Sequence, residues 1–106
     1  MKKFVIIFGL LGYGVANAQT KIPADVEKLL QKNTCLACHN ADKKVVGPAY
    51  KDVAKRNYSK EQIVELIYKP KPSNWPGYPP MAALPNVPRS EALKIATWIV
   101  SLNKKK

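Results

Sequence analysis

Apolar residues recur at helical spacing in two segments of the chain. Near the start, apolar residues at positions i, i+3 and i+4 predict a short helix over about residues 24–33: Val26, Leu29 and Leu30. Pro23 suits the beginning of that helix, where a missing N–H costs no helical hydrogen bond. Near the end, a longer stripe predicts a helix that Ser90 caps and that ends at about Leu102: Ile95, Trp98, Ile99 and Leu102. We expect Trp98 to pack in the core.

Two shorter helices are predicted between these segments. Ser59 and Gln62 have the spacing of a capping box, which opens a helix that runs to about Tyr68 and that Pro70 stops. The buried face of this helix is expected to contain Ile63, Leu66 and Ile67. A helical piece over about residues 49–55 would place three side chains on one side: Tyr50, Val53 and Ala54. No segment alternates convincingly with a period of two, so the pattern predicts an all-α fold.

The N-terminal residues are typical of a secretory signal peptide. A positively charged start is followed by an uncharged, mostly apolar run over residues 4–15 and by a cleavage site of small residues, Ala16-Asn17-Ala18. The apolar run is shorter than the roughly 20 residues that cross a bilayer. An uncleaved membrane anchor is the alternative. We predict a cleaved leader over residues 1–18 and a single exported domain over residues 19–106, with no stable membrane anchor.

The charge of the chain bears on its partners. Its 106 residues carry a formal net charge of +11 at pH 7. A positive field of this kind steers acidic surfaces toward a protein, although a solvated, solubilising surface accounts for the same lysines. Export and the lack of a basic–aromatic pattern disfavour binding to nucleic acid. We therefore expect protein partners with acidic docking surfaces.

The only two cysteines and the only histidine lie within five residues, Cys35-Leu36-Ala37-Cys38-His39. A C-x-x-C-H run is the attachment pattern for c-type haem, in which each thiol adds to a haem vinyl group and the histidine ligates the iron. Three other interpretations are weaker. Zinc needs four ligands and this run supplies at most three, while a thioredoxin-like C-x-x-C needs a βαβ context. A plain Cys35–Cys38 disulfide is the last alternative.

A proline-rich segment from Lys69 to Pro88 separates the last two predicted helices and holds seven of the nine prolines. Its composition alone is typical of a linker. However, a connection of this length in so small a domain is unusual unless it has a function. It also contains Trp75, Tyr78 and Met81, for which a solvated linker has little use. We expect an ordered loop that packs against the haem.

Met81 is the candidate for the second axial ligand of the iron. No second histidine exists, both cysteines are used in attachment, and Met1 leaves with the predicted leader. The combination of His39 and Met81 would raise the reduction potential, as His/Met ligation does in cytochromes c. The alternative is that Met81 fills a gap in the core.

These motifs give the chain a resemblance to the class I bacterial cytochromes c of the c-551/c-552 group. The resemblance extends over nearly all of residues 19–106. It rests on the C-x-x-C-H run, on V-G-P-A-Y-K-D-V-A at residues 46–54, on Pro80-Met81 and on the final helix with Trp98. It implies a small class I cytochrome c fold, in which about four helices wrap around one covalently attached haem c.

The resemblance also implies roles for two further residues. The Pro48 carbonyl would accept a hydrogen bond from Nδ1 of His39 and so direct Nε2 toward the iron, the alternative being a plain turn. Trp75 would donate to a haem propionate, the alternative being simple packing. Two features depart from the family. The asparagine near the ligand methionine falls two positions late, at Asn86, and Leu66 lies near the place of a propionate-side arginine.

Together these features predict a soluble periplasmic cytochrome with one haem that carries single electrons between respiratory redox proteins and is not an enzyme. We expect a monomer that docks weakly and transiently. One alternative is a ligand-binding or peroxidase-type haem protein with a labile sixth ligand, although the lack of a distal histidine disfavours peroxidase chemistry. Another is a subunit docked permanently on one oxidase or dehydrogenase.

Overall fold

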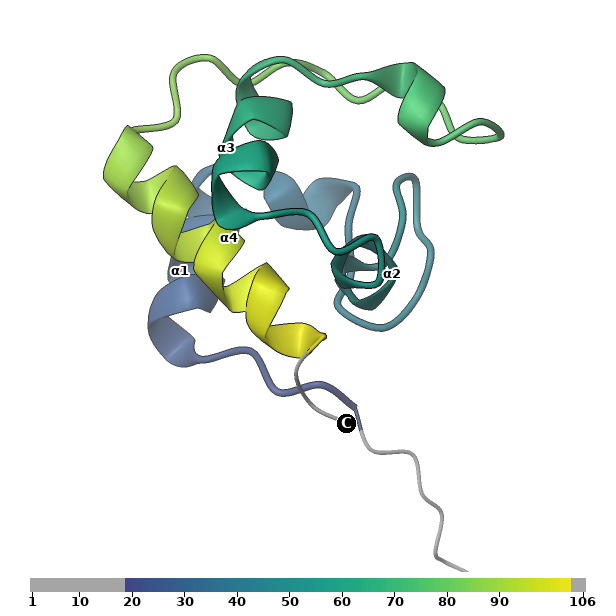
Figure 1. The fold of residues 1–106 in the computed structure, drawn as a ribbon. Coiled ribbons are helices and arrows are strands. Elements are labelled where there is room, and N and C mark those ends of the chain that lie inside the picture. Colours follow the sequence, from purple (N-terminus) through teal and green to yellow (C-terminus); the bar gives the residue numbers. More distant parts are fainter. Residues whose placement is uncertain (1–18, 104–106) are drawn as a thin grey trace, which may run out of the picture.

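A computed structural model describes residues 19–103 of the chain (Figure 1). The predicted leader, residues 1–18, and residues 104–106 lie outside the described part. The elements in chain order are α1 (Ala24–Lys32), the 3₁₀ turn η1 (Cys35–Ala37), α2 (Tyr50–Ala54), α3 (Lys60–Tyr68), the 3₁₀ turn η2 (Pro72–Asn74) and α4 (Arg89–Leu102). No strand occurs between residues 19 and 103, and the predicted all-α fold is confirmed. None of the helices in this range is long and apolar enough to cross a membrane.

Helix α4 is the element on which the others pack, since α1, α2 and α3 each contact it (Figure 1). Its inner face is formed by buried side chains: Ala92, Ile95, Ala96, Trp98 and Ile99. Removing each of the large ones from water contributes about 1.5–3 kcal/mol. Ala92 and Ala96 are fully buried, and their small side chains let the neighbouring helices approach closely. The predicted core position of Trp98 is confirmed.

Helix α3 shows where the predicted pattern is right and where it is wrong. The capping box is present, because Ser59 Oγ accepts from the Gln62 N–H at 3.1 Å and Gln62 Oε1 accepts from the Ser59 N–H at 2.8 Å. Ile63 is buried as predicted, and so is Val64. Leu66 and Ile67, expected on the buried face, are only half-buried because they line a cavity, although Ile67 also packs against the core.

The start of α4 differs from the prediction. The helix begins at Arg89 with Pro88 in the capping position, so Ser90 lies inside the first turn and caps nothing. Proline suits this place because its φ, here −58°, is already near the helical value. Glu91 in the first turn instead reaches α1, where its carboxylate accepts from Lys32 Nζ at 2.6 Å and from Asn33 Nδ2 at 3.2 Å.

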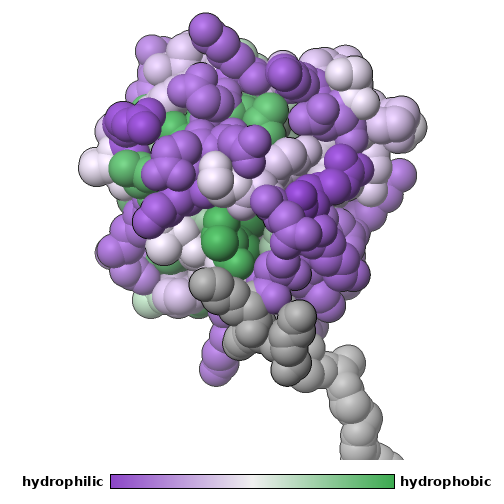
Figure 2. All heavy atoms as spheres, in the orientation of Figure 1, coloured by the Kyte–Doolittle hydropathy of each residue, from purple (hydrophilic) through white to green (hydrophobic). Residues whose placement is uncertain are grey.

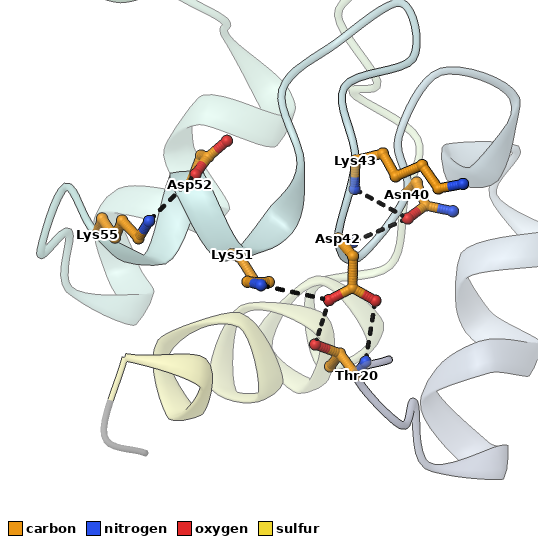
Figure 3. Close-up of polar contacts among 7 residues, drawn as sticks. All are labelled: Thr20, Asn40, Asp42, Lys43, Lys51, Asp52 and Lys55. Atoms are coloured by element: carbon orange, nitrogen blue, oxygen red, sulfur yellow. Dashed lines mark hydrogen bonds and ion pairs between the residues drawn. The ribbon is translucent and has the colours of Figure 1, made fainter. Parts of the chain in front are cut away.

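The N-terminal segment is fastened to the loop that follows His39 (Figure 3). The carboxylate of Asp42 accepts from the Thr20 N–H at 2.9 Å and from Thr20 Oγ1 at 2.5 Å. Lys51 Nζ lies 3.7 Å from the same carboxylate. Asn40 Oδ1 in turn accepts from the backbone N–H of Asp42 at 2.8 Å. These contacts hold the pKa of the Asp42 carboxyl below its ordinary value of 3.8, mainly through the Thr20 hydroxyl.

The substitution Asp42→Asn is expected to lower the free energy of unfolding by about 1–2 kcal/mol at neutral pH, since it removes charge-assisted hydrogen bonds. Because the folded pKa of Asp42 is lowered, its contribution is complete above pH 3.8 and is lost as the pH falls through the folded value. The difference between the two proteins should therefore shrink in acid. Denaturant unfolding measured across acidic and neutral pH checks this.

Asp52→Asn is the matched control. It removes the same charge from α2, where Asp52 forms only an exposed ion pair with Lys55 at 3.6 Å (Figure 3). Such a pair contributes at most about 0.5 kcal/mol. Equal losses from the two substitutions would show that the contacts of Asp42 with Thr20 do not stabilise the fold.

Candidate functional site

A mostly apolar cavity of about 350 Å³ lies between the C-x-x-C-H run, the segment 46–53, helix α3 and the loop 69–88. This volume is within the range of sites that hold small molecules and cofactors. All six residues predicted for the site line it: Cys35, Cys38, His39, Pro48, Trp75 and Met81. The structure thus brings together side chains that are separated by up to 46 positions in the sequence, as expected for one site.

The C-x-x-C-H run enters the cavity wall through a tight turn after α1. Thr34 adopts a left-handed conformation, with φ 61°, so the chain turns away from the axis of α1 at this residue. In η1 the carbonyl of Cys35 then accepts from the N–H groups of Cys38 at 3.2 Å and of His39 at 3.0 Å. The side chains of all three residues line the same cavity as a result. Both cysteines are free thiols, Cys35 half-buried and Cys38 exposed, and burial raises the pKa of the Cys35 thiol.

The imidazole of His39 is held in one protonation state. Its Nδ1 lies 2.7 Å from the Pro48 carbonyl oxygen. A carbonyl can only accept, so Nδ1 carries the proton and donates it, which leaves the lone pair of Nε2 available to a metal. Burial lowers the pKa of His39, and the hydrogen bond to Pro48 opposes this only in part. The ring is therefore neutral at physiological pH, as a metal-ligating imidazole must be.

Two further residues of the same short segment fix the plane of the imidazole. The ring of Tyr50 stacks on it, with centroids 4.7 Å apart and planes inclined by 22°. Tyr50 is buried and meets Trp98 of α4 edge-on at 5.5 Å, so this support extends to the core. Gly47 packs so closely that a Cβ there would lie 2.8 Å from His39 Cε1. The sequence placed Tyr50 only on one side of a short helix and within the motif at residues 46–54, because nothing in its spacing indicates a contact with His39.

The loop 69–88 forms the opposite wall and is ordered by contacts to the helices. Its far end is tied to α3, since the Ile67 carbonyl accepts from the Leu84 N–H at 3.0 Å and Tyr68 Oη donates to the Val87 carbonyl at 2.8 Å. Met81 lies within the loop, lines the cavity and is 39% exposed. Trp75 lines the same wall and meets Tyr78 edge-on at 5.6 Å.

The alternatives to a haem find little support in this geometry. Between residues 19 and 103 no three His, Cys, Asp or Glu side chains are grouped as a metal site would need, and no βαβ unit is formed. The residues present do fit a covalently attached haem. Two free thiols and an imidazole with an available lone pair line one apolar cavity, and a thioether side chain lines the same cavity. Leu66, near the place of the family's arginine, lines the cavity as an apolar residue.

Comparison with known proteins finds relatives that cover almost all of this chain. The chain is 37% identical over 108 aligned positions to cytochrome c-552 of Hydrogenobacter thermophilus, which covers 96% of this chain and 99% of the relative. It is 36% identical to cytochrome c-551 of Stutzerimonas stutzeri, with the same coverage. The crystal structure of Nitrosomonas europaea cytochrome c552 superposes with a TM-score of 0.66 at 35% identity, over 72% of this chain and 98% of that one. No family model matches the sequence.

Proposed function

Since this chain belongs to the c-551/c-552 group of class I cytochromes c and carries one covalently bound haem c, we propose that it is a periplasmic electron carrier between respiratory redox proteins. In this proposal Cys35 and Cys38 form the thioether links to the haem. His39 and Met81 would both ligate the iron, and Pro48 and Trp75 would support the site.

The observation that carries the proposal is the state of His39. Its Nδ1 proton is donated to the Pro48 carbonyl, and the ring is neutral and fixed by Tyr50. Nε2 is thus a prepared ligand that needs no deprotonation before it binds a metal. Two free thiols line the same cavity as this imidazole, and together they are the groups that a covalently attached haem requires.

The bound haem supplies one-electron chemistry between Fe(III) and Fe(II). The residues of the chain make this site suited to transfer rather than to catalysis. His39 and Met81 would both ligate the iron, so no ligand position would remain for a substrate. The neutral thioether of Met81 and the apolar cavity wall would favour the less charged, reduced state and so raise the reduction potential.

We propose export through a cleaved leader over residues 1–18, and a contact close to the proposed cleavage site is compatible with that cleavage. Thr20, two positions after the proposed cleavage site, is already fastened to Asp42. Cleavage after Ala18 would therefore leave the domain over residues 19–106 with this contact intact.

Transient docking of acidic redox partners is supported by the surface. Every lysine between residues 19 and 103 is exposed, and hydrophilic residues cover most of the face seen in Figure 2. Opposite charge speeds the encounter of two proteins without requiring a large interface. We propose a monomer that meets its partners in this way, and gel filtration of the purified protein tests the monomeric state.

A redox-titrated absorption spectrum of the protein, produced with a haem-attachment system, tests the proposed function. We expect a haem that stays with the denatured protein, a low-spin ferric state and the weak thioether-to-iron charge-transfer band at the red end of the spectrum. A single one-electron titration step should follow. A high-spin ferric protein that binds cyanide or carbon monoxide freely would instead favour the alternative with a labile sixth ligand.

A further inference from the structure

The guanidinium group of Arg56 lies over the indole of Trp75, with Cζ 3.7 Å from the ring centroid. Arg56 follows α2, whereas Trp75 follows η2 in the loop 69–88, so the contact joins two segments that are far apart in the sequence. Nη1 of Arg56 also donates to the carbonyl of Asn74 at 2.9 Å. The planar guanidinium thus holds the loop by both a stacked ring and a backbone oxygen, a combination that lysine cannot reproduce.

The contact of Arg56 with Trp75 lies on one side of Met81 in the loop 69–88, and the contacts of the loop with α3 lie on the other side. Leu84 and Val87 tie one end of the loop to α3. Between this end and Trp75 lies Met81, and within the described chain the amides of residues 81–83 make no backbone hydrogen bond. The segment that carries Met81 is therefore held mainly at its two ends. In Figure 1 this loop runs from α3 out above α2 and back to α4. A contact near η2 therefore holds the part of the loop that lies farthest from these two helices.

Two neighbouring contacts also hold this part of the loop 69–88. Asn74 Nδ2 donates to Tyr58 Oη at 3.2 Å, which fastens η2 to the chain segment just after Arg56. Lys44 Nζ lies 4.4 Å from the ring centroid of Tyr78, a longer contact without a hydrogen bond. Arg56 has no carboxylate partner among the ion pairs of residues 19–103, so no other acidic group competes for its guanidinium.

We propose that Arg56 is a positioning residue that latches the loop 69–88 over the cavity and thereby keeps Met81 at the haem iron. The role of Met81 in this statement rests on the proposed function. The latch itself rests on the contacts of Arg56 with Trp75 and Asn74. Opening of the loop moves Met81 away and admits an outside ligand, so the latch sets how readily such a ligand competes.

Imidazole binding to the ferric holoprotein measures this competition. The substitution Arg56→Met keeps an apolar stem but removes the charge and the hydrogen-bond donors. It should raise the affinity for imidazole about 5- to 30-fold, the effect of losing one cation–π contact and one hydrogen bond. Arg56→Lys retains the charge over the ring and should restore part of the difference. Lys55→Gln removes the same charge from the adjacent position, where Lys55 pairs with Asp52, and should leave the affinity unchanged.

Amide hydrogen exchange tests whether Arg56 holds the loop 69–88, independently of whether Met81 ligates the iron. The N–H of Trp75 donates to the Pro72 carbonyl at 3.0 Å and that of Tyr78 to the Trp75 carbonyl at 3.2 Å. Both amides should exchange faster in Arg56→Met than in Lys55→Gln, while amides of α4 stay equally protected. Equal exchange and equal imidazole affinity in these two variants would overturn the latch. Absence of the thioether band from the unmodified protein would instead overturn the role of Met81, and faster exchange would still support the latch on the loop.

Discussion

Replacing Met81 with leucine is expected to lower the midpoint reduction potential by on the order of 0.2 V, within the roughly 0.8 V over which axial ligands set haem potentials. Leucine has nearly the same volume as methionine and keeps the apolar contact with the cavity, but it has no sulfur. The fall in reduction potential would therefore report the loss of the sulfur ligand and not a change in packing. The thioether band should disappear, and the ferric protein should become high-spin and bind cyanide readily. Potentiometric titration and the ferric absorption spectrum measure these changes.

Val46→Ala is the control for this experiment. Val46 also lines the cavity and is 45% exposed, close to the 39% of Met81, but its side chain carries no donor atom. Its truncation should keep the thioether band and change the potential far less. If Met81→Leu behaves like Val46→Ala, Met81 only fills space in the cavity and the sixth ligand must be sought elsewhere.

The sequence predicted most of the helices because their determinants are local. The capping box of Ser59 and Gln62 and the apolar stripe of α4 depend on neighbours three or four residues away, and both are present. The start of α4 was predicted two positions late because Ser90 has the side chain of a common cap, while the fixed φ of Pro88 already serves that place. Leu66 and Ile67 were predicted on the buried face, and the cavity that they line was not foreseen, because periodicity gives a face of the helix but not what that face contacts.

In the candidate site, too, the local features could be predicted from the sequence, whereas a contact between distant segments could not. The cluster of Cys35, Cys38 and His39 is a local motif, and family resemblance gave the hydrogen bond between His39 and Pro48, which is present at 2.7 Å. The roles of these residues toward the haem stay predictions. The contact of Arg56 with Trp75 could not be predicted, because a polar residue in a turn carries no periodic signal for a partner 19 positions away. Only the folded chain brings the two together.

Gly47 is the position where a single methyl group should disturb the site most. A Cβ there would lie 2.8 Å from His39 Cε1, 3.1 Å from Nδ1 and 3.3 Å from Nε2. The ring cannot simply move away, because Pro48 holds its Nδ1 and Tyr50 stacks on it. Gly47→Ala is therefore expected to lower the free energy of unfolding of the holoprotein by about 1–3 kcal/mol, as overpacking does. It should also shift the NMR signals of the His39 ring and lower the yield of correctly ligated protein.

Gly77→Ala separates this steric effect from backbone strain. Gly77 has a φ of +91°, which an L side chain rarely adopts, yet a Cβ there would meet nothing within 4 Å. Its substitution should cost about 1–3 kcal/mol through strain alone and leave the His39 signals in place. Gly47 has no such φ, so a disturbance of the His39 ring in Gly47→Ala alone can come only from the contact with the imidazole. If both variants leave the ring signals unchanged, the close approach of Gly47 does not orient His39, and the Pro48 hydrogen bond with the Tyr50 stack must suffice.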